Sequence, residues 1–391
     1  MTTQFEIESF NEKISVQRIL GQISGKNEAP TVLAFGGIHG NERAGINALL
    51  NVFKTIKQDD IPLQGNFYGI AGNLNAISKN IRFQNVDLNR IWTKKAILNL
   101  HLEENFDEET LEQKEIYNII KSILEKEKGP FYFLDLHTTS AETQPFITIS
   151  DSLNNRKFTA NFSIPTILGI EEFLDGPLLT YINDFGHISL GFEAGQHDKE
   201  ASVDNCISFL WLALVAANCV KQKDVKKYHF YKRSLAMFKQ TQDFYKIDYK
   251  YTIKPTEDFK MVKGYQNFQE INKNELLAFS DGNEIKANFQ GKIFMPLYQQ
   301  KGNDGYFIIS KISKFWLNAS RVLRRLHFHN LLKLLPGVSS IKTKPYTLIV
   351  NPKTAQFLAT DIFHLFGYRK KVIKNNKLHF IKRDRKITEF L

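Results

Sequence analysis

The sequence predicts an α/β fold whose first 220 residues form a mostly parallel or mixed sheet flanked by helices. Three observations lead to this prediction. Strand-like apolar runs alternate with segments of helical periodicity. The runs are apolar at nearly every position, as in strands that helices cover on both faces of a sheet. Beyond about residue 240 the pattern changes to short strands separated by Gly, Asn and Asp, which indicates a small β domain.

The first 220 residues can be assigned element by element. Strands are expected at residues 14–20, 31–35, 65–73, 131–137, 145–150 and 188–193. Helices are expected at 43–57, 110–127 and 203–220, because apolar side chains recur there at helical spacing. Residues 73–90 are polar and show little periodicity, so we predict a long functional loop.

The rest of the chain is expected to form two further parts. Short strands are predicted at 244–253, 275–279, 284–287, 292–297 and 306–309. After them we expect an amphipathic helix at 316–335, a strand at 346–350, a helix at 353–366 and a basic hairpin around Asn375 and Asn376. The chain is therefore divided into an α/β domain at 1–225, a small β domain at 240–313 and a basic α+β extension at 314–391.

Positive charge is concentrated at the C-terminal end of the 391-residue chain. Residues 314–391 hold 17 Lys and Arg against 3 Asp and Glu, a net charge of +14 in a chain whose total is +11, so residues 1–313 sum to −3. Such a run is most often a solvated surface. The alternative is a nucleic-acid-binding protein that acts through this extension, which would bind with a steep salt dependence. The extension carries no motif of a nucleic-acid-binding module, so we do not favour this alternative.

The cysteines and the apolar segments indicate a cytoplasmic location. Cys206 and Cys219 are thirteen residues apart on one expected helix, so they cannot bridge each other, and a reducing compartment is favoured. The N-terminus shows no signal-peptide pattern. The longest uncharged apolar segment, 205–220, has 16 residues, which is short for a membrane span. We therefore expect a cytoplasmic protein without a membrane segment.

Three side chains near strand ends have the chemistry of a zinc site. His39 and Glu42 lie three residues apart in a glycine-rich turn between a strand and a helix, where both can reach one ion. This spacing is common by chance, but His137 ends another expected strand and Glu193 a third, and sites gather at the carboxyl ends of parallel strands. A catalytic zinc takes three protein ligands and keeps a position for water. Asp135, on the same strand face as His137, could accept its second hydrogen bond.

Five segments occur in an order and spacing that resemble one enzyme family. They are Gly36-Gly37-Ile38-His39-Gly40-Asn41-Glu42-Arg43, Arg82, Asp87-Leu88-Asn89-Arg90, Asp135-Leu136-His137-Thr138-Thr139 and Gly191-Phe192-Glu193-Ala194-Gly195. Together they resemble the succinylglutamate desuccinylase/aspartoacylase family, the deacylase branch of the zinc carboxypeptidase superfamily. The resemblance covers roughly residues 30–220 and implies a zinc-carboxypeptidase-like fold. Residues 240–310 are similar to the family's C-terminal β domain, which caps the active site, and the extension after 313 has no recognised counterpart.

The resemblance implies a role for each motif residue. It places one zinc per chain on His39, Glu42 and His137, with Glu193 as general base. It implies that Arg82 polarises the scissile carbonyl, that Asn89 and Arg90 hold a substrate carboxylate, and that Tyr306 approaches from the β domain. An Arg about ten residues before the catalytic Glu helps to bind acylaspartate in aspartoacylases, and Asn183 stands there in this chain. Asp87 is interpreted as a loop cap.

We therefore expect a zinc-dependent amidohydrolase, a hydrolase of linear amide C–N bonds. It would use metal-activated water to remove the acyl group from a small N-acylated amino acid or related carboxylate-bearing amide. The enzymatic alternative is a zinc carboxypeptidase for peptides or cell-wall fragments, in which the groove would stay open. The sequence leaves open the acyl group, the amine, the use of N-acetylaspartate given Asn183, and whether the chain forms a homo-oligomer.

Overall fold

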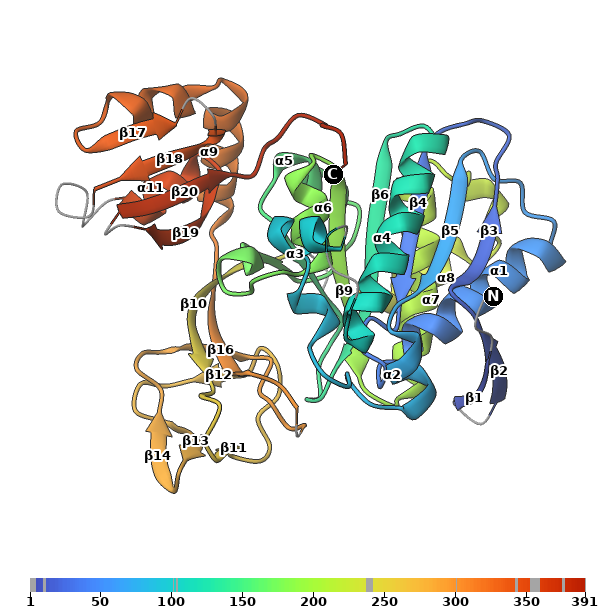
Figure 1. The fold of residues 1–391 in the computed structure, drawn as a ribbon, viewed down its shortest axis with the longest axis horizontal. Coiled ribbons are helices and arrows are strands. Elements are labelled where there is room, and N and C mark those ends of the chain that lie inside the picture. The colour runs from blue at the N-terminus through green and yellow to red at the C-terminus, as the bar shows by residue number, and fades with distance from the viewer. Residues whose placement is uncertain are drawn as a thin grey trace.

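The computed structural model describes residues 5–9, 12–100, 102, 105–236, 242–299, 301–341, 344–351, 359–374 and 377–390. Figure 1 shows an α/β body that carries a small β part and a separate C-terminal sheet with its own helices. No helix in these ranges is long and apolar enough to cross a lipid bilayer. Cys206 and Cys219 are both buried and free, so neither forms a disulfide.

A mixed sheet of 11 strands runs through the α/β body, in the order β12-β15-β16-β10-β8-β7-β9-β6-β4-β5-β3. Its strands are β3 (Ile19–Ile23), β4 (Thr31–Gly36), β5 (Asn66–Ala71), β6 (Phe131–Thr139), β7 (Phe146–Ile149), β8 (Thr166–Leu168), β9 (Ile188–Gln196), β10 (Phe244–Thr252), β12 (Glu270–Ile271), β15 (Gly291–Phe294) and β16 (Asp304–Lys311). Strands β5, β4, β6 and β9 pair in parallel, whereas β7 is antiparallel to β9. The predicted fold class is confirmed.

Helices cover both faces of this sheet. They are α1 (Ala44–Gln58), α2 (Leu74–Lys79), α3 (Lys94–Asn99), α4 (Glu108–Lys126), α5 (Leu153–Thr159), α6 (Leu178–Asp184), α7 (Glu200–Ala216) and α8 (Tyr228–Ala236). Along β4, Val32 and Ala34 enter the core beneath α1 and α7, while Leu33 and Phe35 enter the core beneath α4 and α6 (Figure 1). A strand that is apolar at every position therefore separates two hydrophobic cores, as the sequence predicted.

Two of the segments that differ from the expected pattern lie within the first 90 residues. The region 73–90, expected as a loop, contains α2, whose first turn is capped because the Asn73 side chain accepts a hydrogen bond from the Ala76 backbone at 3.0 Å. The region 14–20, expected as one strand, is shared by β2 (Glu12–Val16) and β3. Strand β2 pairs with β1 (Phe5–Ser9) in a separate two-stranded sheet, so the two strands have different partners.

The central sheet continues into the part of the chain expected as a β domain. Strand β10 pairs in parallel with β8 and antiparallel with β16, so its backbone joins the two parts. A second sheet of β11 (Phe259–Met261), β13 (Leu276–Ser280) and β14 (Asn283–Lys286) packs beyond it. The proposed domain limits stay a prediction, and residues 237–241, next to the limit at 240, lie outside the described ranges.

The C-terminal extension forms a four-stranded sheet with helices against it. Its elements are α9 (Lys314–Arg325), β17 (Val338–Ile341), β18 (Lys344–Val350), α11 (Ala359–Leu365), β19 (Tyr368–Lys374) and β20 (Lys377–Lys382). The helix expected at 316–335 ends at Arg325, because His327 takes a left-handed backbone with φ 58° and a 3-10 turn follows. Of the helix expected at 353–366, residues 353–358 lie outside the described ranges, as does the hairpin turn at 375–376.

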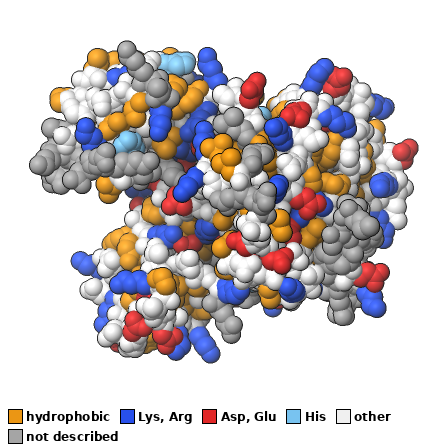
Figure 2. Space-filling model, in the orientation of Figure 1, with side chains coloured by type: hydrophobic (Ala, Val, Ile, Leu, Met, Phe, Trp, Pro, Cys, Tyr) orange, Lys and Arg blue, Asp and Glu red, His pale blue; other side chains and the backbone are white. Residues whose placement is uncertain are grey.

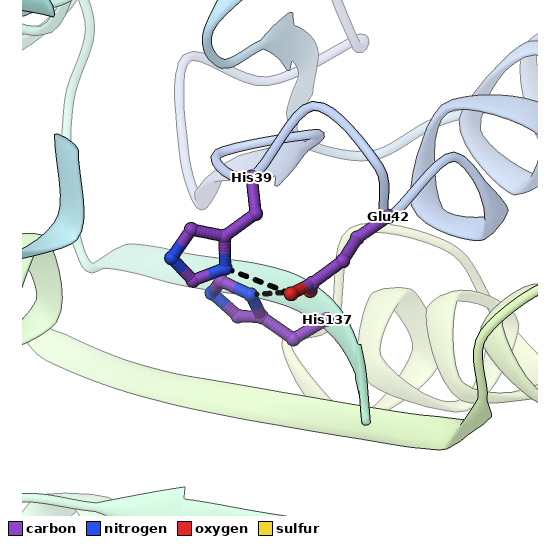
Figure 3. Close-up of side chains that lie close together, drawn as sticks. All are labelled: His39, Glu42 and His137. Carbon is purple, nitrogen blue, oxygen red and sulfur yellow. Dashed lines mark hydrogen bonds and ion pairs between the residues drawn. The ribbon is translucent and has the colours of Figure 1, made fainter. Parts of the chain in front are cut away.

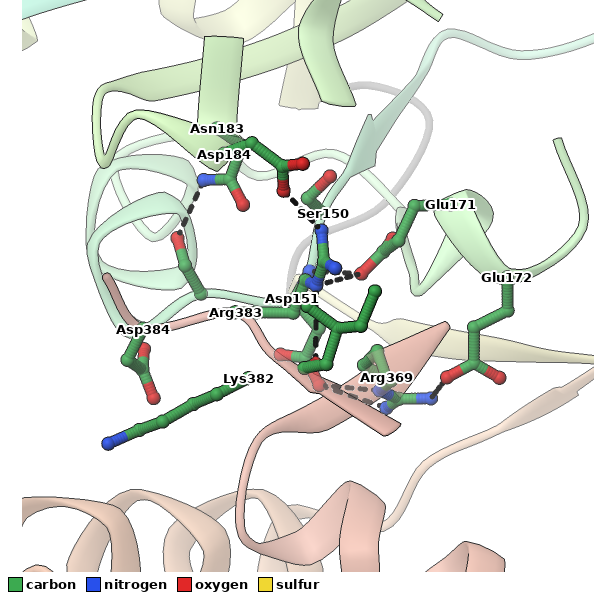
Figure 4. A network of polar contacts seen from close by, with 12 residues as sticks. Ser150, Asp151, Glu171, Glu172, Asn183, Asp184, Arg369, Lys382, Arg383 and Asp384 are labelled. Atoms are coloured by element: carbon green, nitrogen blue, oxygen red, sulfur yellow. Dashed lines mark hydrogen bonds and ion pairs between the residues drawn. The ribbon is translucent and has the colours of Figure 1, made fainter. Parts of the chain in front are cut away.

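A buried ionic network joins this extension to the α/β body (Figure 4). Asp151, which follows β7, is fully buried and pairs with Arg156, Arg324 and Arg369. Asp184 at the end of α6 pairs with two further arginines of the extension, Arg383 and Arg385. Four of the extension's arginines are therefore engaged in ion pairs with the α/β body.

On the face drawn in Figure 2, the Lys and Arg side chains of the described residues are not gathered into one patch. In Figure 2 they are spread over both the extension and the α/β body on the visible face. The last described residues run back over α6, where the Thr388 backbone donates a hydrogen bond to the Phe185 carbonyl at 3.1 Å (Figure 1). The extension is therefore held to the α/β body at two places, by the network and by this terminal strap.

Candidate active site

A cavity opens at the carboxyl ends of β4, β6 and β9, and its walls come from both the α/β body and the β part. The turn after β4 is built on glycines for steric reasons. Gly37 has φ 75°, a left-handed value that favours glycine. A Cβ on Gly40 would lie 2.2 Å from the backbone carbon of Ala76, so only glycine allows α2 to approach. This turn brings the next residues over the strand ends.

His39, Glu42 and His137 converge within the cavity (Figure 3). His39 Nδ1 lies 2.8 Å from Glu42 Oε1, and His137 Nδ1 lies 2.9 Å from Glu42 Oε2. All three residues are buried, and their potential ligand atoms lie within 4.8 Å of one another. They are the only such group of His, Cys, Asp or Glu within the described ranges. The group can hold one metal ion, as the sequence predicted.

A carboxylate orients each of the two histidines. His137 Nε2 lies 2.8 Å from Asp135 Oδ2, which agrees with the second hydrogen bond expected of Asp135. His39 Nε2 lies 3.1 Å from Asp87 Oδ1. Asp87 caps its loop, as interpreted, since its side chain accepts a hydrogen bond from the Asn89 backbone at 2.8 Å. The interpretation as a cap alone did not include its contact with His39. With both Nε2 atoms held, both Nδ1 atoms face the shared space, as metal-binding histidines require.

The charges around this group suit a divalent cation. Burial alone would raise the pKa of Glu42, but His39 and His137 lower it well below its usual value. Burial likewise opposes the charged form of Asp87, yet His39, Arg82 and Arg90 lower its pKa. Two imidazole nitrogens and an ionised carboxylate form a donor set that fits zinc.

Glu193 lies beside the histidines with one oxygen unused. It sits on β9 directly opposite His137 in the parallel register, lines the cavity and is 8% exposed. Its Oε2 has no hydrogen-bond partner among the described residues. Burial raises the pKa of the carboxyl to about 8, although His137 and Arg82 act in the opposite direction. A buried carboxylate with an unpaired oxygen is able to accept a proton from water in the cavity.

Arg82 also belongs to the site. Its Nη1 donates a hydrogen bond to Glu42 Oε1 at 3.2 Å, and its Nη2 donates to Asp87 Oδ2 at 3.4 Å. The side chain lines the cavity and is 14% exposed. The guanidinium is therefore placed next to the group that can bind metal, where it could meet a developing negative charge.

Asn89 and Arg90 line the same cavity and are already engaged. Asn89 Oδ1 accepts a hydrogen bond from the Leu178 backbone at 2.9 Å, which ties it to the start of α6. Arg90 Nη2 donates to Asp304 Oδ2 at 3.0 Å, and Lys250 Nζ lies 2.5 Å from Asp304 Oδ1. Asp304 therefore shares its charge between two cations. Asp304 was not expected at the site, because it lies in the stretch of Gly, Asn and Asp residues between two expected strands.

Tyr306 and Asn183 lie away from the cavity. Tyr306 is 1% exposed and stacks on Tyr251 with ring centroids 5.4 Å apart, inside the core of the β part. Its neighbour Phe307 lines the cavity instead, because successive side chains of a strand point to opposite faces. This placement does not support the expected role of Tyr306. Asn183 is buried on α6, where its Nδ2 donates to the His187 carbonyl at 3.4 Å.

Comparisons with known proteins agree with this geometry. A family model described as the succinylglutamate desuccinylase/aspartoacylase catalytic domain matches residues 28–204. The fold is similar to that of succinylglutamate desuccinylase from Vibrio parahaemolyticus, with a TM-score of 0.57 and 15% identity over 80% of this chain and 92% of the other.

Two further solved structures give the same result. A succinylglutamate desuccinylase/aspartoacylase from Rhodobacter sphaeroides has a TM-score of 0.57 and 14% identity, over 80% of this chain and 95% of the other. The product-bound ectoine utilization protein EutE (DoeB) from Ruegeria pomeroyi has a TM-score of 0.55 and 15% identity, over 79% and 94%. At these identities the likeness shows the fold. The family model assigns residues 28–204 to the catalytic domain of the succinylglutamate desuccinylase/aspartoacylase family.

Proposed function

We propose that the protein is a zinc-dependent amidohydrolase that removes the acyl group from a small N-acylated amino acid. The observation that carries this proposal is the placement of Glu193, with its unpaired Oε2, opposite His137 in the cavity that holds the His39, Glu42 and His137 group. A hydrolase of this kind needs a metal site, a base and a charge-stabilising donor in one cavity. Arg82 supplies the charge-stabilising donor.

Each residue of the site has a separate role in the proposed reaction. A zinc ion held by His39, Glu42 and His137 would supply a water of lowered pKa and a positive charge for the amide oxygen. Glu193 accepts the proton of the attacking water as the C–O bond forms, and returns it to the nitrogen as the C–N bond breaks. Arg82 donates hydrogen bonds to the amide oxygen while negative charge develops there. Asn89 and Arg90 hold the substrate carboxylate, for which the planar guanidinium is suited.

The walls of the cavity support a small substrate over a polypeptide. The β part contributes Met295, Leu297, Asp304 and Phe307 to the lining, so it closes one side of the site. A carboxypeptidase would need that side open for the rest of the peptide. Nucleic-acid binding by the extension is also less well supported, because Arg324, Arg369, Arg383 and Arg385 are engaged with the α/β body.

Metal content and one substitution test the proposal. Purified full-length protein should contain about one zinc per chain by elemental analysis and should release free amine from N-acyl amino acids. Glu193→Gln should keep the zinc but lose most activity, since a residue of almost the same shape can no longer accept a proton. Zinc-free protein with full activity, or full turnover by Glu193→Gln, would contradict the proposal.

A further inference from the structure

One side of the cavity, the metal side, holds the potential metal ligands, and the other side is mainly apolar. The two sides are built on different strands of the sheet. The potential metal ligands come from the turn after β4 and from β6, and Glu193 lies on β9. The next strands in the sheet are β7, which runs antiparallel to β9, and β8; the cavity lining continues with Thr148 and Ile149 of β7 and with Ile170, which follows β8. Thr148 on β7 pairs with Gly191 on β9, and both line the cavity, so the two sides share one continuous floor.

The far side is built mainly from apolar side chains. They come from the end of β7, from the segment between β8 and α6, from the first turn of α6, and from the β15–β16 region. These residues are Ile149, Ile170, Leu174, Pro177, Leu179, Met295, Pro296, Leu297 and Phe307. The polar lining residues of the same segments include Ser150, Thr180, Gln299, Asn303 and Asp304; Asp304 is an anion that pairs with Arg90 and Lys250. A substrate group that rests on this wall gains from losing contact with water only if it is apolar itself.

Arg90 is the only basic residue of the described lining that reaches this far side, where it bonds Asp304 at the start of β16. The other basic side chains that line the cavity, His39, Arg82 and His137, lie at the metal side. Arg90 is partly neutralised by Asp304. Asn183 is buried away from the cavity and offers no charge. A second substrate carboxylate directed to the apolar wall would therefore lose its hydration without gaining a partner, which is costly.

Resting on the proposed function, we propose that the preferred substrates are N-acyl amino acids with a single carboxylate and a large apolar group. The carboxylate lies at Asn89 and Arg90, and the apolar group lies against Leu174, Leu179 and Phe307. That group is either the side chain of the amino acid or an extended acyl chain, because either places hydrocarbon on the same wall. Dicarboxylates such as N-acetylaspartate are poor substrates.

Steady-state kinetics of the zinc-loaded full chain test this specificity. The substrates are N-acetyl-L-leucine, N-hexanoylglycine, N-acetylglycine and N-acetyl-L-aspartate. We expect kcat/KM for one of the first two to exceed that for the last two by about tenfold or more, as is typical of an apolar group in a fitting pocket. The first substrate reports a side-chain site and the second an acyl-chain site.

A charge introduced on the wall provides the matched test. Leu174→Arg should lower kcat/KM for the apolar substrates about tenfold or more and raise that for N-acetyl-L-aspartate. The control Leu111→Arg, at a half-exposed position of α4 that does not line the cavity, should change neither. If Leu174→Arg does not fold, Leu179→Lys places a cation on the same wall.

The outcomes separate the two proposals. If N-acetyl-L-aspartate is hydrolysed best by the unmodified chain, the specificity is wrong and the amidohydrolase function stands. If the chain hydrolyses none of these amides nor N-succinyl-L-glutamate, the proposed function fails, and the specificity falls with it. Equal kcat/KM for all four substrates also overturns the specificity, because the wall then contributes nothing.

Discussion

Arg324 in the C-terminal extension donates hydrogen bonds to Asp151 twice, from Nη1 to the carboxylate at 3.3 Å and from Nη2 to the backbone carbonyl at 2.7 Å. Asp151 directly follows Ser150, which lines the cavity (Figure 4). Arg369 approaches from β19, and a Cβ on Gly169, whose φ is 80°, would lie 3.0 Å from its Nη1. The extension is thus fitted closely to the segment beside the active site.

Asp151→Asn should destabilise the fold strongly. The amide keeps the shape of the side chain but removes the only charge on it, leaving Arg156, Arg324 and Arg369 with less compensation in a buried site. Breaking buried ion pairs in this way costs about 3–5 kcal/mol. Urea unfolding of Asp151→Asn measures the loss. Asp258→Asn, which breaks an exposed pair with Lys260, is the control and should change little. Equal stability of both variants would contradict the importance of the network.

Asp135→Asn should weaken metal binding without removing a ligand. Asp135 holds His137 through Nε2, so its loss leaves the ring free to turn away. Substitution of such a partner typically lowers metal affinity about 10- to 100-fold. Competition for zinc with a chelator measures the change, and Asp248→Asn in β10 serves as the control. Unchanged affinity would show that the ring is held by other contacts.

Arg90→Lys should raise KM for the substrate although the charge is kept. The guanidinium can bond Asp304 and a substrate carboxylate at the same time, whereas an ammonium lacks this planar geometry. We expect KM to rise about tenfold with kcat changed less, the size expected for loss of one charge-assisted hydrogen bond. Arg325→Lys, on the exposed end of α9, is the matched control. A KM equal to that of the unmodified enzyme would argue against the carboxylate site.

His187 should make the fold sensitive to acid. It is 5% exposed and packs on Phe131 and Phe133, and burial lowers its pKa from the ordinary 6.5 to about 4. The unfolded chain binds this proton more readily than the folded chain does. The contribution of neutral, buried His187 to the free energy of unfolding is therefore fully present above pH 6.5 and is lost as the pH falls to about 4. The loss is on the order of 3 kcal/mol. His187→Phe should flatten the pH dependence of unfolding over this range, and an unchanged slope would contradict the assignment.

The metal-binding group could be predicted from the sequence because local patterns mark each of its residues. His39 and Glu42 are three residues apart, and His137 ends a strand whose apolar pattern is clear. Short elements were missed because their few residues show too little of a local pattern. Helix α2 has six residues and β8 has three, too few for a periodicity to show.

Contacts between distant segments could not be predicted. Arg90 meets Asp304 across 214 residues, and nothing near either residue signals the pair. Tyr306 was expected near the site from the family resemblance, and the sequence does not tell whether Tyr306 or its neighbour Phe307 faces the cavity. The docking of the extension depends on Asp151 and Asp184, whose neighbours gave no sign of buried partners.

The backbone pairing of β10 with β8 has a consequence for turnover. Phe244, Tyr245 and Lys246 are hydrogen-bonded in register to Thr166, Ile167 and Leu168, so the β part continues the same sheet that holds Glu193. A hinged lid would have to break this ladder at every catalytic cycle. We therefore expect substrate and product to exchange while the β part stays paired to the sheet through β10 and β8.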